Sequence, residues 1–222
     1  PTTSSAASDV YKRQVLEKST MLATLGLFCF LTASNMAAAK AVEFFGIHLT
    51  AGFFTYPFVY LFSSIIMATR SPDVYFKCIT FAYFGYLSFI SLMYIAAILP
   101  GVNAESTYNK SFDLIYNLSN YRIYLSSLCA YFVSMFLFGV LFNSLKIESI
   151  AIRIALATLI VALADVNLFL ILAFWGVKAS SLLMDIMFWA SIKKLVAQLV
   201  LLGPTLLIIN LIRNKHEYCV SN

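Results

Sequence analysis

The chain has 222 residues, of which 61% are hydrophobic and only 11% are charged, and its mean hydropathy is +0.87. One water-soluble core cannot hide this much apolar surface, so the composition excludes a soluble globular protein and predicts an integral membrane protein. The net charge of +5 comes from basic residues dispersed among the predicted loops, without a basic patch interleaved with aromatic residues. We therefore interpret the basic residues as a signal for the orientation of the chain in the lipid bilayer, and we expect no nucleic-acid partner.

The first residues differ in character from the rest of the chain. Residues 1–14, PTTSSAASDVYKRQ, are polar and lack the apolar core and cleavage site of a signal peptide. They are typical of translated adapter sequence at the ends of some metagenomic reads, so we interpret them as a non-native leader. The remaining chain is predicted to form a six-helix transmembrane domain over residues 21–212, followed by a cytoplasmic tail over residues 213–222.

Six apolar segments follow one another along the chain, separated by short polar breaks. Each is long enough to cross a hydrocarbon core of about 30 Å at a rise of about 1.5 Å per residue. The segments are apolar on most faces, whereas a membrane-spanning barrel would alternate apolar and polar positions, so an all-α integral membrane protein is predicted. The predicted spans are residues 21–42, 48–69, 75–99, 121–145, 153–176 and 183–212.

Basic residues in the loops predict the orientation of the six helices. Placing both termini in the cytoplasm puts nine basic residues inside and four outside, and omitting the two in the leader still leaves seven inside. The connection over residues 100–120 then faces outside and is long enough to hold a short helix. The inside residues are Lys12, Arg13, Lys18, Arg70, Lys77, Lys146, Arg153, Arg213 and Lys215, and the outside residues are Lys40, Lys110, Arg122 and Lys178.

The fifth span, TLIVALADVNLFLILAFWG over residues 158–176, contains one carboxylate, Asp165. A charge in mid-bilayer costs about 2.5 to 3.5 kcal/mol on insertion scales, so it indicates a functional group with a partner. Asp165 lies about eleven residues below the outer end of its helix, and Lys194 lies about eleven residues along the next. We therefore predict a buried ion pair between them. It could be a structural salt bridge that fixes the register of the two helices, or part of a substrate or ion site, which we favour.

Other polar and small residues add to this predicted interior. Thr158 shares a helical face with Asp165, and Gln198 lies one turn after Lys194. Asn35 could hydrogen-bond across helices or contact a ligand amide. Small residues at Ser34 and Ala38, and at Ala37 and Ala41, predict that another helix approaches the first helix closely.

Aromatic residues are concentrated in the second span. Most are expected to face lipid, but one or two could stack on a planar ligand. The nucleotide-binding, metalloprotease and Cys/His metal-ligand motifs are absent from the sequence, so no enzyme activity, cofactor or metal site is predicted. The clustered aromatic residues are Phe53, Phe54, Tyr56, Phe58, Tyr60 and Phe62.

Four sequence blocks resemble one known family. The first, SNMAAAKAVEFFGIHLTAGFFTYPF, carries Lys40, Gly46, Gly52 and Pro57, and the second, SSLCAYFVSMFLFGVLFNSLK, carries Ser127 and Tyr131. The third, ALATLIVALADVNLFLILAFWG, carries Thr158 and Asp165, and the fourth, KKLVAQLVLLGP, carries Lys194 and Pro204. Over residues 32–213 the chain resembles the bacterial queuosine-precursor transporter family, also called the vitamin uptake transporter family.

The resemblance implies a six-helix carrier in the bacterial inner membrane that imports a 7-deazaguanine-like base such as 7-cyano-7-deazaguanine. Asp165 would accept hydrogen bonds from ring N–H or amino groups, and Lys194 would hold it ionised or donate to a carbonyl or nitrile. A homodimer or a transporter partner subunit would fit the resemblance. The other implied substrate contacts are Thr158, Asn35, Ser127 and Tyr131, with Lys40, Gly46, Gly52, Pro57 and Pro204 as packing residues.

The chain also departs from the family pattern at several positions, where that pattern has polar or charged residues and, in one case, a glycine. These departures leave open a non-transporting substrate-binding or assembly subunit, which would use the small-residue face of the first helix on a partner. They also leave open a diverged member with another small-molecule substrate. The departing residues are Ser64, Ala68, Ser71, Met135, Phe138, Ala157 and Ala162.

Overall fold

The computed structural model describes the whole chain except residues 1–2, 39, 45–46, 103–105, 117–120 and 219–222. Its elements are almost all helical. In chain order they are α1 (Thr3–Ala37), β1 (Ala41–Phe44), β2 (Ile47–Thr50), the 3-10 helix η1 (Ala51–Phe54), α2 (Pro57–Thr69), α3 (Pro72–Ile98), α4 (Thr107–Ile115), α5 (Tyr121–Ser144), α6 (Ile150–Phe174) and α7 (Ser180–Tyr218).

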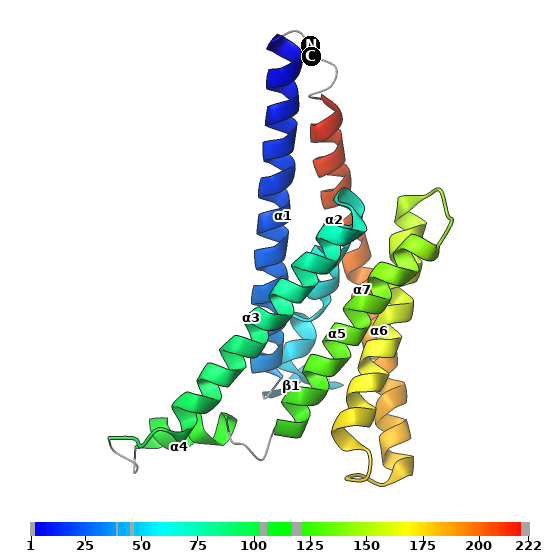
Figure 1. Ribbon diagram of the computed structural model, residues 1–222. Helices are drawn as coiled ribbons and strands as arrows, with labels where there is room; N and C mark the ends of the chain where they lie inside the picture. The colour runs from blue at the N-terminus through cyan, green and yellow to red at the C-terminus, as the bar shows by residue number, and fades with distance from the viewer. Residues whose placement is uncertain (1–2, 39, 45–46, 103–105, 117–120, 219–222) are drawn as a thin grey trace.

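Six described helices are long and apolar enough to cross a membrane. They correspond one by one to the six apolar segments of the sequence, which confirms the all-α, six-span prediction. The short helix α4 lies in the predicted connection between the third and fourth spans. Both termini lie at the same end of the bundle, as six crossings require, with α4 at the other end (Figure 1). Which end faces the cytoplasm stays a prediction from the loop charges.

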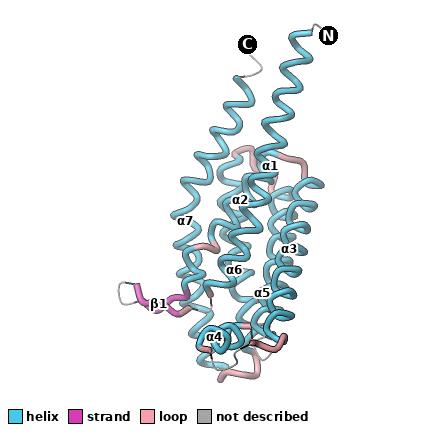
Figure 2. Tube along the Cα trace, turned by 90° about the vertical axis from the view of Figure 1, so that its left-hand side faces the viewer, coloured by secondary structure: helices cyan, strands magenta, loops and turns pink. Residues whose placement is uncertain are grey.

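The predicted leader and tail are not separate from the helices in the structure. α1 begins at Thr3, so most of residues 1–14 extend the first helix, and α7 continues to Tyr218. Both extensions project beyond the rest of the bundle (Figure 2). The non-native origin of residues 1–14 stays a prediction.

Each of the six spans packs against the next in the order α1, α2, α7, α6, α5 and α3, and α3 packs against α1. The short helix α2 also contacts α3, α5 and α6, so it lies closest to the centre of the bundle. Over half of its membrane-spanning window is buried, a larger share than in any other described span. Because α2 touches every other span, side chains on it are well placed to meet partners from distant parts of the chain.

Local sequence explains where several helices begin and end. Proline occupies the first position of α2 and of α3, where its missing N–H costs no helical hydrogen bond. The Ser149 side chain accepts a hydrogen bond from the backbone N–H of Ile152 and caps α6. α6 ends at Phe174, and Gly176 follows with a φ of +76°, a conformation that glycine adopts at little cost.

The connection between the first two spans differs from the prediction. Helices were expected up to residue 42 and again from residue 48, but α1 ends at Ala37 and an antiparallel hairpin of β1 and β2 follows. Lys40 therefore lies after the end of α1 instead of inside the first span. The alternation of polar Glu43 and His48 with β-branched and aromatic residues is typical of short strands. This hairpin is the one exception to the all-α architecture among the described residues.

Candidate functional site

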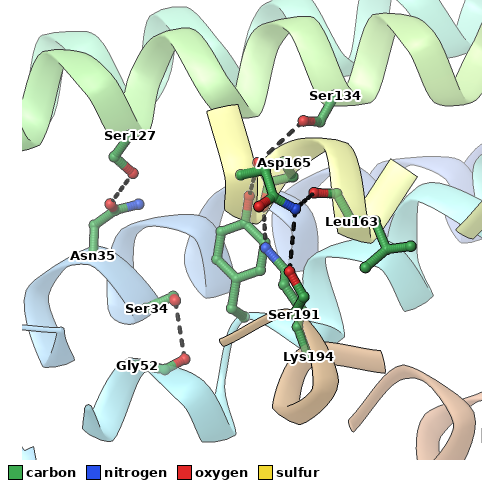
Figure 3. Close-up of polar contacts among 11 residues, drawn as sticks. Ser34, Asn35, Gly52, Ser127, Ser134, Leu163, Asp165, Ser191 and Lys194 are labelled. Carbon is green, nitrogen blue, oxygen red and sulfur yellow. Dashed lines mark hydrogen bonds and ion pairs between the residues drawn. The ribbon is translucent and has the colours of Figure 1, made fainter. Parts of the chain in front are cut away.

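The predicted ion pair is present in the structure. Asp165 of α6 is buried, with 3% of its surface exposed, and one of its carboxylate oxygens pairs with Lys194 Nζ of α7. Its other oxygen, Oδ1, accepts hydrogen bonds from the Tyr56 hydroxyl at 3.0 Å and from Ser134 Oγ at 3.1 Å. Figure 3 shows the carboxylate between these helices. Three donors, from the residue that precedes α2, from α5 and from α7, thus satisfy the charge of Asp165, which is the condition for keeping a carboxylate inside a membrane protein.

Aromatic rings of α2 cover the ammonium group of this pair. Lys194 Nζ lies 4.1 Å from the centre of the Tyr56 ring and 5.8 Å from that of Tyr60. A cation is attracted to the face of an aromatic ring, and the attraction is stronger where water is absent. Tyr56 therefore contacts both charges, since its hydroxyl donates to Asp165 and its ring faces Lys194.

The start of α2 determines where Tyr56 lies. Tyr56 is the residue immediately before Pro57, where the chain turns from η1 into α2. Thr55 and Tyr56 both donate their backbone N–H groups to the carbonyl of Gly52, so the chain between η1 and α2 is held in one conformation. This connection places the Tyr56 side chain against the middles of α6 and α7.

A second polar contact joins α6 to α7 beside the ion pair. Asn167, two residues after Asp165, donates its amide to Ser191 Oγ at 3.1 Å and to the Leu163 carbonyl at 2.8 Å. Ser191 lies one turn before Lys194 on α7 (Figure 3). The two helices are therefore linked by a neutral hydrogen bond as well as by the ion pair.

Asn35 and Ser127, both predicted site residues, contact each other and do not contact Asp165 directly. Ser127 Oγ of α5 donates to the amide oxygen of Asn35 on α1, and the Asn35 amide nitrogen donates to the Leu31 carbonyl at 2.9 Å. The pair is drawn apart from the Asp165 cluster in Figure 3. This hydrogen bond joins α1 to α5.

Two other predicted site residues bind backbone carbonyls. Thr158 is buried and donates its hydroxyl to the Ile154 carbonyl at 2.7 Å, one turn earlier on α6. Tyr131 is fully buried and donates to the Ile79 carbonyl of α3 at 3.5 Å. Neither makes a described hydrogen bond with Asp165 or Lys194, so their roles in binding substrate stay predictions.

The small-residue face of α1 meets the 3-10 helix η1 at Gly52. A Cβ atom on Gly52 would lie 2.4 Å from the Ser34 carbonyl oxygen, so only glycine lets η1 pack this tightly. Ser34 Oγ donates to the Gly52 carbonyl at 3.1 Å. The small-residue face of α1 is therefore used for packing within the chain.

The remaining predicted packing residues lie apart from this contact. Lys40 is exposed after the end of α1, and its carbonyl accepts a hydrogen bond from Ala51 N–H. Gly46 lies outside the described residues. Pro204 lies inside α7, where it removes one backbone donor from the helical ladder.

Tyr56 and Ser134 are site residues that the sequence did not single out. Tyr56 was one of six aromatic residues in its segment, and nothing in the sequence distinguished it from the others. Ser134 lies seven residues, or about two helical turns, after Ser127, so a search along that face of α5 would have found it.

One family model matches the chain, over residues 50–209, and it is described as "Putative vitamin uptake transporter". The chain belongs to this family. The match includes α2, α5, α6 and the part of α7 that carries Lys194, so Asp165 and its three partners all fall within it. No curated protein and no solved structure matches the chain.

The chemistry of this cluster suits a transporter of small molecules. It combines a carboxylate acceptor, an ammonium donor, two aromatic faces and a serine hydroxyl inside a multi-pass membrane protein. A ligand with N–H donors could replace Tyr56, Ser134 or Lys194 as the partner of Asp165, and a planar ligand could stack on Tyr56.

Replacing Tyr56 with Phe tests the double role of this residue. The variant keeps the ring over Lys194 but removes one donor to the carboxylate, and a hydrogen bond to a charged group contributes about 1.5–3 kcal/mol. We expect uptake to fall about tenfold and the unfolding temperature in detergent to fall as well, because the hydrogen bond that orients the carboxylate also stabilises the folded protein. Tyr56→Leu, which removes the ring as well, should lower uptake further. Equal uptake by both variants and the wild type would contradict this role.

Proposed function

We propose that this protein is a secondary transporter of the bacterial inner membrane that imports a small planar metabolite, with a queuosine precursor such as 7-cyano-7-deazaguanine as its substrate. The family supports uptake of a vitamin-like small molecule. The observation that carries the proposal is the buried pair of Asp165 and Lys194 with the Tyr56 ring across it. Asp165 supplies a hydrogen-bond acceptor, Lys194 a donor and Tyr56 an aromatic face, and the three lie together inside the bundle.

The recognition chemistry follows from these groups. Asp165 accepts hydrogen bonds from the ring N–H and amino groups of the base, and Lys194 donates to its carbonyl or nitrile. Tyr56 stacks on the ring plane. The chain carries no nucleotide-binding motif, so uptake is not powered by hydrolysis on this chain.

Complementation tests the substrate. The host is a bacterium that can neither synthesise nor import the precursor, and it carries this chain while growing with 7-cyano-7-deazaguanine. We expect queuosine to reappear in its tRNA, with the empty vector as the negative control. Clear presence of the protein in the membrane without queuosine in tRNA would contradict this substrate.

A non-transporting binding or assembly subunit is the alternative suggested by the departures from the family pattern. The small-residue face of α1 was the surface expected to meet a partner subunit. In the structure, Gly52 of η1 packs against Ser34 on this face. Affinity purification in mild detergent separates the two functions. A stoichiometric partner with ATPase activity would favour the subunit, and purification of this chain without a partner supports the carrier.

A further inference from the structure

Three buried polar groups lie beside the Asp165 cluster, namely the hydroxyl groups of Tyr60 and Ser64 on α2 and the amide nitrogen of Gln198 on α7. The Tyr60 hydroxyl interacts with Asp165, whereas Ser64 Oγ and the Gln198 amide nitrogen have no hydrogen-bond partner in the described part of the chain. Their residues are 1%, 0% and 5% exposed. A buried donor without a partner costs free energy, and apolar side chains of similar shape would fill the same space without that cost. These groups are therefore candidates for binding a ligand.

Helical spacing places the three groups along one seam. Tyr60 and Ser64 lie one and two turns after Tyr56 on α2, and Gln198 lies one turn after Lys194 on α7. α2 and α7 pack against each other and run in the same direction, toward the end of the bundle where both chain termini lie (Figure 1). Because Lys194 Nζ faces the rings of both Tyr56 and Tyr60, Gln198 comes level with Tyr60 and Ser64.

The seam continues directly from the Asp165 cluster. The Tyr60 hydroxyl interacts with the Asp165 carboxylate both electrostatically and as a hydrogen-bonding group, and the Tyr60 ring contacts that of Tyr56, with the ring centres 5.9 Å apart. On α6, Thr158 lies two turns before Asp165 toward the same end, and its hydroxyl donates to the helix backbone, which leaves its oxygen able to accept a bond. A ligand that leaves Asp165 toward the terminal end of the bundle thus meets further polar groups.

The chemistry of these groups indicates which part of a ligand they bind. Tyr60, Ser64 and Gln198 are all uncharged, so they offer no counter-charge to a phosphate or carboxylate. A primary amide presents a donor beside an acceptor, which matches a ligand edge with the complementary pair, as in a lactam or carboxamide. Hydroxyl groups on either side can donate or accept.

We propose that Tyr60, Ser64 and Gln198 form a second binding station, on the terminal side of the ion pair, for the lactam or carboxamide edge of a small uncharged ring. The station rests on the proposed transport function and extends it. The ligand passes from the charged pair, which binds its N–H groups, to a neutral station where its amide edge is hydrogen-bonded. Two stations of different chemistry let a ligand leave the first without losing all of its hydrogen bonds.

Uptake by purified variants in proteoliposomes tests the station, with radiolabelled 7-cyano-7-deazaguanine as the probe. Tyr60→Phe, Ser64→Ala and Gln198→Leu are each expected to lower uptake about tenfold, because a ligand edge left unpaired in a buried site is strongly disfavoured. Tyr86→Phe is the matched control, since the Tyr86 hydroxyl on α3 is also buried and without a partner but lies outside the seam. Gln198→Leu should also lose the preference for the probe over its analogue with an amino group in place of the ring carbonyl.

Cysteine labelling tests the station without depending on the substrate. In a background without native cysteines, Ser64→Cys should react with a water-soluble thiol reagent in membranes, because a substrate path must be hydrated in some state. Ala82→Cys, which is fully buried on α3, should not react. If the wild type does not take up the probe but Ser64→Cys reacts, the substrate is wrong and the station is supported. Normal uptake by all three variants would overturn the station, and so would an unreactive Ser64→Cys if the wild type does not take up the probe.

Discussion

Asp165→Asn is expected to lower uptake by about two orders of magnitude while most of the protein remains folded. Loss of the charge weakens the hydrogen bonds that N–H groups of a ligand would donate to this residue, and a hydrogen bond to a charged group contributes about 1.5–3 kcal/mol. Asparagine keeps an oxygen that accepts from Tyr56 and Ser134. The link between Asn167 and Ser191 continues to hold α6 to α7. Uptake per folded molecule and thermal unfolding in detergent are the two measurements.

Lys194→Met provides the complementary test. It leaves the Asp165 carboxylate buried with only two neutral donors, whereas Asp165→Asn leaves an ammonium group that is partly exposed and still faces the Tyr56 ring. Lys194→Met should therefore lower the unfolding temperature more than Asp165→Asn does. The double variant should regain part of that stability, because no unpaired charge remains, and should still fail to transport. Normal uptake by the double variant would mean that the pair serves only to hold the two helices together.

Gly52→Ala is expected to destabilise the protein strongly. The new Cβ would meet the backbone of α1, with the Ser34 carbonyl oxygen 2.4 Å away and the Ala38 nitrogen 3.2 Å away, and backbone atoms cannot rotate aside. Overpacking of this kind costs about 1–3 kcal/mol, and here it also displaces the acceptor of the Ser34 hydroxyl. Because η1 leads into Tyr56, uptake should fall together with stability.

Gly203→Ala is the matched control for this substitution. A Cβ atom at Gly203 would have no described atom within 4 Å, and Gly203 lies inside α7. Alanine is favoured over glycine inside a helix by about 1 kcal/mol, so this variant should unfold at the same temperature or slightly higher. Equal unfolding temperatures for the two variants in the same detergent would contradict the close packing of η1 on α1.

The sequence predicted the six spans and the ion pair because both depend on local properties. Hydropathy over about 20 residues decides whether a helix can cross the membrane. Asp165 and Lys194 lie on consecutive helices with a short connection. Both residues are about the same number of residues from that connection, so the sequence places them at the same depth in the membrane. The hairpin at Ala41–Thr50 was missed because its two short strands lie within stretches that are also apolar enough to extend the neighbouring helices.

The partners of the pair required the tertiary structure. Tyr56 is 109 residues from Asp165 along the chain, and Ser134 is 31 residues away. Hydropathy places a residue at a depth in the membrane but does not say which way its helix is rotated or which helices are its neighbours. Packing around the central helix α2 decides both, and it selects Tyr56 from a run of similar aromatic residues. The sequence alone thus determined where the charges lie in depth, and the packing of the helices decided what surrounds them.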